Sequence, residues 1–192
     1  ACDIGGEYLV MEKETQSYSY SKTVKICGVE EKEVRDKIRD LMEEQKQLKV
    51  TIQSCPGEVA VQVEASGEQE EKVKGPVKAM VRELKIRFGS SIFTTNAKVT
   101  LEETIVQLLK EQNMTITTVE SCTGGMLSAR LTDVAGVSEV FKQGYVTYSN
   151  KAKRKLIGVK KMTLKKYTAV SEQTAWEMAR GGAFLTGADV CI

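Results

Sequence analysis

Residues 119–128, VESCTGGMLS, bring together an acid, hydroxyl side chains, a thiol and two glycines between a predicted strand and a predicted helix. Glycines at such a junction let the backbone approach a ligand, and the first turn of a helix offers free N–H groups to an anion. Ser121 and Thr123 add hydroxyl donors. The segment matches neither a Walker A loop nor G-x-G-x-x-G. Its spacing alone therefore favours a structural corner over a ligand site.

The absence of histidine limits the chemistry further. A Ser-His-Asp triad, a Cys-His dyad and a histidine-based zinc site are excluded within this chain. A nucleophile must then use a lysine, a carboxylate, a tyrosine or a backbone amine as its base. Five dispersed cysteines without a C-x-x-C pair argue against a metal site and for reduced thiols in a cytoplasm. Cys122, among apolar neighbours, is interpreted as a buried bystander.

A serine and a lysine further along form a second candidate group. Ser138 follows a glycine-bearing turn, Lys153 lies on the helix predicted after a strand at 144–149, and Tyr148 stands near the end of that strand. A lysine desolvated among apolar groups can act as base to a serine, so Ser–Lys is the best nucleophile pair that the chain offers. Spacing alone still favours a simpler interpretation, in which Ser138 caps a helix and Lys153 is a surface charge.

The predicted strands and helices around these residues divide the chain into two parts. We expect a leader or linker over residues 1–21 and a small α+β domain over 22–96. The domain alternates strand and helix patterns in the order β-α-β-β-α-β. The predicted strands are TVKICGV, KVTIQSC, EVAVQVEA and SSIFTT; the predicted helices are 30–45 and 68–88, the second starting late because of Gly75-Pro76.

Residues 97–192 predict an α/β layered sheet. Thr100 with Glu103 forms a capping box for a helix, and strands are predicted at TITTV, GYVTYS and ADVCI. Ser171 is expected to cap a helix that runs to about Phe184. Because the sequence stops within an apolar strand pattern, we expect an incomplete sheet.

Charge and composition bound the class of protein. The 41% hydrophobic and 28% charged content is that of a globular protein, and no apolar run reaches membrane-spanning length. The net charge of +2 does not by itself imply a nucleic-acid or membrane partner. Residues 97–192 hold 13 basic and 9 acidic residues, with the excess clustered at 151–155 and 160–166. That cluster suits an anionic small molecule and a solvated helix face equally well.

The stretches TTVESCTGGMLSARLTDVAGVSEVFKQGYVTYSNKAKRKLIGV, TLKKYTAVSEQTAWEMARGG and GADVCI resemble the C-terminal domain of the CinA family, competence/damage-inducible proteins. Residues 22–95 resemble the family's KH-type middle domain. The resemblance implies hydrolysis of nicotinamide mononucleotide to the nicotinate form and ammonia, without a cofactor. It implies Ser138 as nucleophile, Lys153 as its basic partner and Tyr148 in the same site. It also implies a substrate pocket lined by the E-S-C-T-G-G signature: Glu120, Ser121, Thr123, Gly124 and Gly125.

Three departures from the family pattern qualify that expectation. The threonine-bearing T-G-(I/N)-A-G-P stretch that follows in the family is not in this sequence, so we expect this chain alone to be inactive or weak. The family's N-terminal domain is not in it either, and the KH-like part has no G-x-x-G loop, which argues against RNA binding. We expect a homodimer without metal or membrane contact. The alternative is a non-catalytic binding or scaffold protein that uses its KH-like domain for nucleic-acid or protein contacts.

Overall fold

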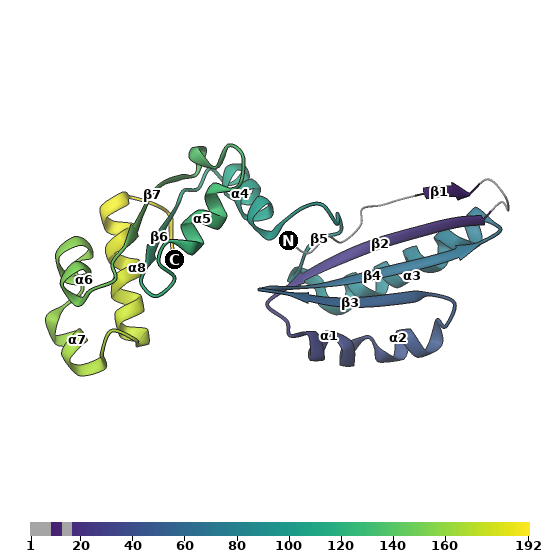
Figure 1. Cartoon of the computed structure of the whole chain (residues 1–192), viewed down its shortest axis with the longest axis horizontal. Coiled ribbons are helices and arrows are strands. Elements are labelled where there is room, and N and C mark those ends of the chain that lie inside the picture. Colours follow the sequence, from purple (N-terminus) through teal and green to yellow (C-terminus); the bar gives the residue numbers. More distant parts are fainter. Residues whose placement is uncertain (1–8, 13–16) are drawn as a thin grey trace. The chain divides into compact units, whose positions relative to one another are not determined.

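The computed structural model describes residues 9–12 and 17–192, which form two compact units divided between Leu101 and Glu102 (Figure 1). Each unit has its own sheet and its own hydrophobic core. No helix in the described part of the chain is long and apolar enough to cross a membrane. The mixed α+β and α/β fold class predicted from the sequence is confirmed.

The first unit is built on an antiparallel sheet with strand order β1-β2-β4-β3, in which β5 also pairs with β2. Strands β2 and β4 pair along their whole length, and β1 and β5 share the outer edge of β2 at different ends. The elements are β1 (Leu9–Glu12), β2 (Ser17–Cys27), α1 (Glu31–Lys37), α2 (Arg39–Glu44), β3 (Lys49–Cys55), β4 (Glu58–Gly67), α3 (Glu70–Phe88), η1 (Gly89–Ser91) and β5 (Ile92–Thr94).

The three helices of this unit bury their apolar sides in one core on one face of the sheet. Alternate residues of β2 and β4, such as Val24 and Val61, enter that core because side chains alternate between the faces of a strand. Val34 from α1 and Leu84 from α3 pack against them. The β-α-β-β-α-β order is therefore confirmed from β2 to β5.

Three details of the first unit differ from expectation. The sheet begins inside the expected leader, because Leu9–Glu12 and Ser17–Ser21 are strand; the rest of that leader lies outside the described residues. The first helix is two helices that meet at Ile38, which is buried in the core. Helix α3 begins at Glu70 and runs through Pro76, because Val73 and Val77 on either side are both held in the core.

The second unit contains a parallel sheet with strand order β7-β6-β8. Strand β8 is held beside β6 partly by Asp189, whose Oδ2 accepts hydrogen bonds from the N–H and the hydroxyl of Thr115 at 2.7 and 2.9 Å. The elements are α4 (Leu101–Glu111), β6 (Ile116–Glu120), α5 (Met126–Thr132), η2 (Val137–Glu139), β7 (Phe141–Val146), α6 (Asn150–Ile157), α7 (Lys161–Tyr167), α8 (Glu172–Thr186) and β8 (Val190–Cys191).

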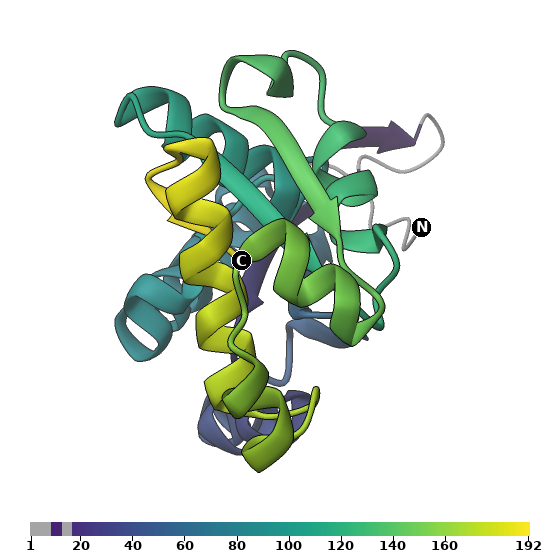
Figure 2. The same ribbon diagram turned by 90° about the vertical axis from the view of Figure 1, so that its left-hand side faces the viewer.

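Helices cover both faces of this sheet, which makes the second unit a three-layer structure. Val106 of α4 and Leu131 of α5 pack with Ile116 on one face. On the other face, Ile157 and Met178, from α6 and α8, pack with Val119. Figure 2 shows α8, in yellow, lying along the sheet. The layered α/β class is confirmed, and α7 is a helix that the sequence patterns did not predict.

Two adjacent glycines bring α8 very close to its neighbours. A Cβ on Gly181 would lie 1.9 Å from the carbonyl oxygen of Ile157, and a Cβ on Gly182 would lie 2.3 Å from Cγ2 of Val119. Only glycine fits at these positions without displacing backbone or core atoms. The helix starts at the predicted cap, where the Ser171 hydroxyl accepts a hydrogen bond from the N–H of Thr174.

Candidate functional site

The candidate site lies at the carboxyl ends of two neighbouring parallel strands, β6 and β7. Glu120 pairs with Val146 across the two strands, and the N–H of Thr147 donates to the carbonyl of Glu120 at 2.8 Å. Ser121 is the first residue after β6, and Thr147 is the first after β7. In open α/β sheets ligands bind at this edge, because loops from adjacent strands meet there.

Lys153 is the central residue of the site. It lies on α6, one turn after the cap that Ser149 forms with the N–H of Ala152, and its side chain is 0% exposed. Its Nζ is 2.8 Å from the hydroxyl of Ser121, 2.6 Å from the carbonyl oxygen of Thr147 and 3.4 Å from that of Tyr148. The interpretation of Lys153 as a surface charge is therefore wrong.

Lys153 Nζ donates to all three of these oxygens, which match the three N–H donors of an ammonium. Burial removes water from the ammonium and lowers the pKa of Lys153 below its ordinary value of 10.5, although the nearby thiol of Cys122 opposes the shift. A neutral amine has two N–H donors and one lone pair, and two of its partners are carbonyl oxygens, which only accept. When the amine is neutral and both of its N–H groups donate to the carbonyls, its lone pair can accept the proton of the Ser121 hydroxyl. The arrangement is that of a base and a nucleophile.

Glu120 organises the loop that carries Ser121. Its carboxylate is buried and accepts hydrogen bonds from the N–H groups of Gly125, Leu127 and Ser128 and from the Ser128 hydroxyl, at 2.6 to 3.1 Å. Burial would raise the pKa of Glu120, but the hydrogen bonds from Ser128, Thr123 and Leu127 outweigh it, and the pKa falls to about 2. These bonds occupy the carboxylate, so Glu120 shapes the site through the loop.

The loop itself turns tightly through two glycines. Gly124 and Gly125 have φ of 60° and 101°, in the region that favours glycine. The N–H of Gly124 donates to the carbonyl of Ser121, and the N–H of Met126 to that of Thr123. The chain therefore reverses direction immediately after Ser121 and enters α5 with Thr123 exposed. Cys122 is exposed as well, so its interpretation as a buried bystander is wrong.

Ser138 lies at the other end of β7. It is an exposed residue in the middle of η2, before β7 begins, whereas Lys153 contacts the residues that follow β7. A six-residue strand spans roughly 20 Å, so the structure does not bring Ser138 and Lys153 together. The carbonyl of Ser138 accepts a hydrogen bond from Lys142. Tyr148 does lie at the site, where its carbonyl contacts Lys153 and its residue is 75% exposed.

Sequence reasoning missed two contributors and one pairing. Thr147 and Ser128, which hold Lys153 and Glu120, carried no signal because their roles depend on backbone and loop geometry. The pairing of Ser121 with Lys153 had a signal: both residues follow consecutive strands of a predicted parallel sheet. Among the residues that the structure describes, no group of three or more acidic, cysteine or histidine side chains is placed to hold a metal ion.

Comparisons with known proteins agree with this two-unit organisation. Residues 21–94 match the damage-inducible protein CinA KH domain, and residues 98–192 match the CinA C-terminal domain. A Clostridium novyi relative is 41% identical over 182 residues, which cover 95% of this chain and 44% of the relative. A CinA-like protein of Kosmotoga olearia is 39% identical over 171 residues, covering 89% and 41%. The chain thus spans less than half the length of these relatives.

Solved structures of the same kind were also found. The competence damage-inducible protein A of Klebsiella pneumoniae is 39% identical, with a TM-score of 0.45, over 45% of this chain and 54% of that protein. A competence or damage-inducible protein of Enterobacter asburiae is 37% identical, with a TM-score of 0.47, over 49% and 61%. Together, the two domain matches cover nearly all of the described chain in the order of its two units. The chain belongs to the CinA family.

Proposed function

We propose that this chain carries the Ser–Lys pair of an amidohydrolase, with Ser121 as nucleophile and Lys153 as base. The observation that carries the proposal is the contact between a fully buried lysine amine and the Ser121 hydroxyl at 2.8 Å, with two carbonyl oxygens holding the same amine. Ser121 takes the role that the family resemblance had suggested for Ser138.

The reaction follows from the geometry. Neutral Lys153 removes the proton from the Ser121 hydroxyl as Oγ attacks the carbonyl carbon of an amide. The tetrahedral intermediate collapses, the C–N bond breaks, and the Lys153 ammonium gives its proton to the leaving ammonia. Water, activated by the same amine, then hydrolyses the acyl–serine ester to a carboxylate and returns the free hydroxyl. No step needs a cofactor.

The substrate assignment is the carboxamide of nicotinamide mononucleotide. It rests on membership of the CinA family and on the E-S-C-T-G-G residues around Ser121. Gly124 lies in a left-handed turn where a Cβ would meet nothing within 4 Å, so its surroundings leave room for a bound molecule. Thr123, exposed beside it, hydrogen-bonds Glu120 through its side chain, and its hydroxyl oxygen can still accept a hydrogen bond from the substrate.

The first test measures ammonia released from nicotinamide mononucleotide by this chain, and in parallel by a longer CinA protein that contains it. Ser121→Ala and Lys153→Met should each abolish release, whereas Ser138→Ala, the matched control, should leave it intact. Full activity in Ser121→Ala, or its loss in Ser138→Ala, would return the nucleophile to Ser138. Circular dichroism of each variant confirms that the fold is kept.

A second measurement depends only on the Ser–Lys pair and not on the rest of the substrate pocket. A fluorophosphonate probe reacts with an activated serine without requiring the complete substrate pocket. We expect the adduct on Ser121, located by peptide mass spectrometry, and its loss in Lys153→Met. An adduct on another serine would contradict the assignment.

The proposal includes a homodimer in a cytoplasm. Among the described residues Cys27, Cys55, Cys122 and Cys191 form no disulfide, which is compatible with a reducing compartment. Sedimentation equilibrium distinguishes a dimer from the 21.2 kDa monomer.

A further inference from the structure

A strongly basic surface lies on the last third of the chain, separate from the Ser121–Lys153 pair. Residues 150–167 contain eight lysines and arginines and no acidic residue. One of the eight, Lys153, is buried in the candidate site, and the others are exposed. The seven exposed cations lie on and between α6 and α7: Lys151, Arg154, Lys155, Lys160, Lys161, Lys165 and Lys166.

None of these seven charges is held in a direct ion pair within the described residues. Glu177 of α8 interacts electrostatically with Lys160 and also accepts hydrogen bonds from the backbone N–H of Lys160 and the hydroxyl of Thr163. Seven exposed cations are thus partly offset at one position, and the surface presents a net positive field to solvent.

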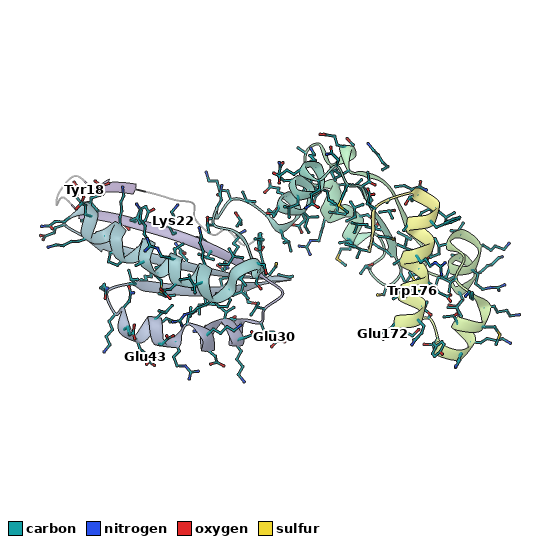
Figure 3. The ribbon with its side chains drawn as sticks, turned by 180° about the vertical axis from the view of Figure 1, so that it is seen from behind. Tyr18, Lys22, Glu30, Glu43, Glu172 and Trp176 are labelled. Atoms are coloured by element: carbon teal, nitrogen blue, oxygen red, sulfur yellow. The ribbon has the colours of Figure 1, made fainter. Side chains whose placement is uncertain are left out.

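An aromatic recess adjoins this surface. A hollow of about 410 Å³ lies between α7 and α8 and is lined by Thr163, Tyr167, Glu172, Gln173, Trp176 and Glu177. Trp176 is 62% exposed, with the guanidinium of Arg180 5.3 Å from its ring centre, and Tyr167 lies below the ammonium of Lys166 at 4.8 Å. Figure 3 labels Trp176 and Glu172 on α8. Two exposed rings thus lie beside a row of cations.

Three kinds of polyanion could bind exposed cations: an anionic membrane, a nucleic-acid duplex and a single strand. An anionic membrane would also meet the exposed Leu156 and Met162 of α6 and α7 beside the cations, so binding to anionic vesicles is an outcome that the test must distinguish. A nucleic-acid duplex offers phosphates to the cations but keeps its bases stacked away from Trp176. A single strand offers both phosphates and free base faces, and exposed rings with cations are the features that single-strand binding uses.

We propose that the surface formed by α6, α7 and the start of α8 binds single-stranded nucleic acid. The exposed lysines of residues 150–167 contact phosphates, Trp176 stacks on a base, and Gln173 and Glu172 lie where base edges would enter the recess. This site is in the second unit and is independent of the KH-like domain and of the proposed hydrolysis.

The test uses the full chain and a roughly 12-nucleotide oligothymidylate. Trp176 is the only tryptophan, so quenching of its fluorescence reports stacking directly. Binding should weaken steeply between about 50 and 200 mM salt. Replacing Lys160, Lys161, Lys165 and Lys166 by Gln should flatten the slope of log K against log salt by about 3, since each phosphate contact in a single strand contributes about 0.7.

A matched control removes the same net charge elsewhere. Lys32, Lys46, Lys72 and Lys78 are exposed in the first unit, and replacing them by Gln should leave affinity and salt slope nearly unchanged. Trp176→Ala should weaken binding of a labelled oligonucleotide about tenfold, whereas Phe184→Ala, an exposed ring on α8 outside the recess, should not.

Four results would overturn the proposal. The first is that the oligonucleotide does not bind at low salt, and the second is that both sets of lysine replacements lower the affinity equally. The third is that a duplex binds as tightly as the single strand without quenching the fluorescence of Trp176. The fourth is that the chain binds phosphatidylserine vesicles but not the oligonucleotide. The last would assign the surface to a membrane.

Discussion

Lys153 combines two properties that rarely occur together, full burial and direct contact with a hydroxyl. Most buried lysines would be costly, but here two carbonyl oxygens satisfy the amine whether it is charged or neutral. The chain has no histidine, so no imidazole competes with Lys153 as a base near neutral pH. A pH dependence of the proposed reaction therefore contains no contribution from an imidazole.

The first prediction concerns that pH dependence. Burial lowers the pKa of Lys153 below 10.5, and only the neutral amine can take the proton of Ser121. The rate of Ser121 labelling by a fluorophosphonate should rise with pH through an inflection below 10.5. The control is a free serine peptide under the same conditions. An inflection at the ordinary value of lysine would contradict the role of burial.

Glu120 gives a second prediction, on stability. Its folded pKa of about 2 lies below its ordinary value of 4.5, so the ionised carboxylate stabilises the fold above about pH 4.5, and this is lost as the pH falls toward 2. Glu120→Gln should lower the free energy of unfolding at neutral pH by about 2 kcal/mol, because charge-assisted hydrogen bonds are lost.

Urea unfolding followed by Trp176 fluorescence at several pH values checks this prediction. The difference between the two proteins should shrink as the pH falls below about 4.5. Asp133→Asn, at an exposed acid of the same unit, is the control. A difference for Glu120→Gln that is constant with pH would contradict the charge-based explanation.

Ser121, Lys153 and Glu120 show which parts of the site could be predicted from the sequence. Spacing alone favoured a structural corner at residues 119–128 and a surface charge at Lys153; only the family resemblance implied a pocket at Ser121, Thr123 and the two glycines and a basic role for Lys153. The sequence did not pair Ser121 with Lys153, because pairing depends on the register of β6 and β7, in which Glu120 lies opposite Val146. Nor did it show that Glu120 is used within the loop, since that requires the turn through Gly124 and Gly125.

At the scale of elements, the close approach of α8 to α6 and β6 determines the second unit. Gly181 lies against the backbone of Ile157, and Gly182 against Val119. Because α6 carries Lys153 and β6 leads into Ser121, this contact also fixes how far apart the two residues lie. A change in α8 is thus expected to reach the site through packing alone.

The third prediction replaces Gly182 by Ala. Alanine favours a helix by about 1 kcal/mol relative to glycine, but the added methyl group would lie 2.3 Å from Val119 and 2.8 Å from the thiol of Cys191. We expect a net loss of about 1–3 kcal/mol in the free energy of unfolding, measured in urea. Ala175→Gly, at an exposed position of the same helix, measures the effect of helix propensity alone on the free energy of unfolding. Stabilisation by Gly182→Ala would contradict the packing.

The strands and helices were largely predictable, because their apolar residues recur with clear periods. Strands β3 and β4 alternate on either side of Pro56-Gly57 as predicted. Helix α7 was missed because three of its seven residues are lysines and only Thr163 and Leu164 are buried, which is too short a pattern to show a helical period. The early start of β2 was missed because the polar segment SYSYS is strand through its pairing with β1 and β4. Such pairing is tertiary information.

At the scale of the whole molecule, the described chain is two units with separate hydrophobic cores. One core is formed around β2 and β4, and the others lie on the two faces of β6. Separate cores allow separate unfolding transitions. The only tryptophan, Trp176, belongs to the second unit and reports that unit alone.

The fourth prediction uses this asymmetry. Leu84→Ala removes a fully buried side chain from the first core and should cost that unit about 2–5 kcal/mol. The urea midpoint measured by Trp176 fluorescence should stay unchanged, while the far-ultraviolet circular dichroism should show an earlier first transition. Leu164→Ala, in the second unit, should shift the Trp176 midpoint. A shift of that midpoint by Leu84→Ala would show that the two units unfold together.

The bonds around Lys153 have a consequence for how this site would decay over evolutionary time. Ser121 is partly exposed in a loop, so its replacement removes the nucleophile and leaves the core intact. Replacing Lys153 leaves the carbonyls of Thr147 and Tyr148 without their donor, which costs stability. A lineage that abandons the reaction should therefore lose the serine first and keep the lysine. A buried lysine facing an alanine would mark a descendant of a former enzyme.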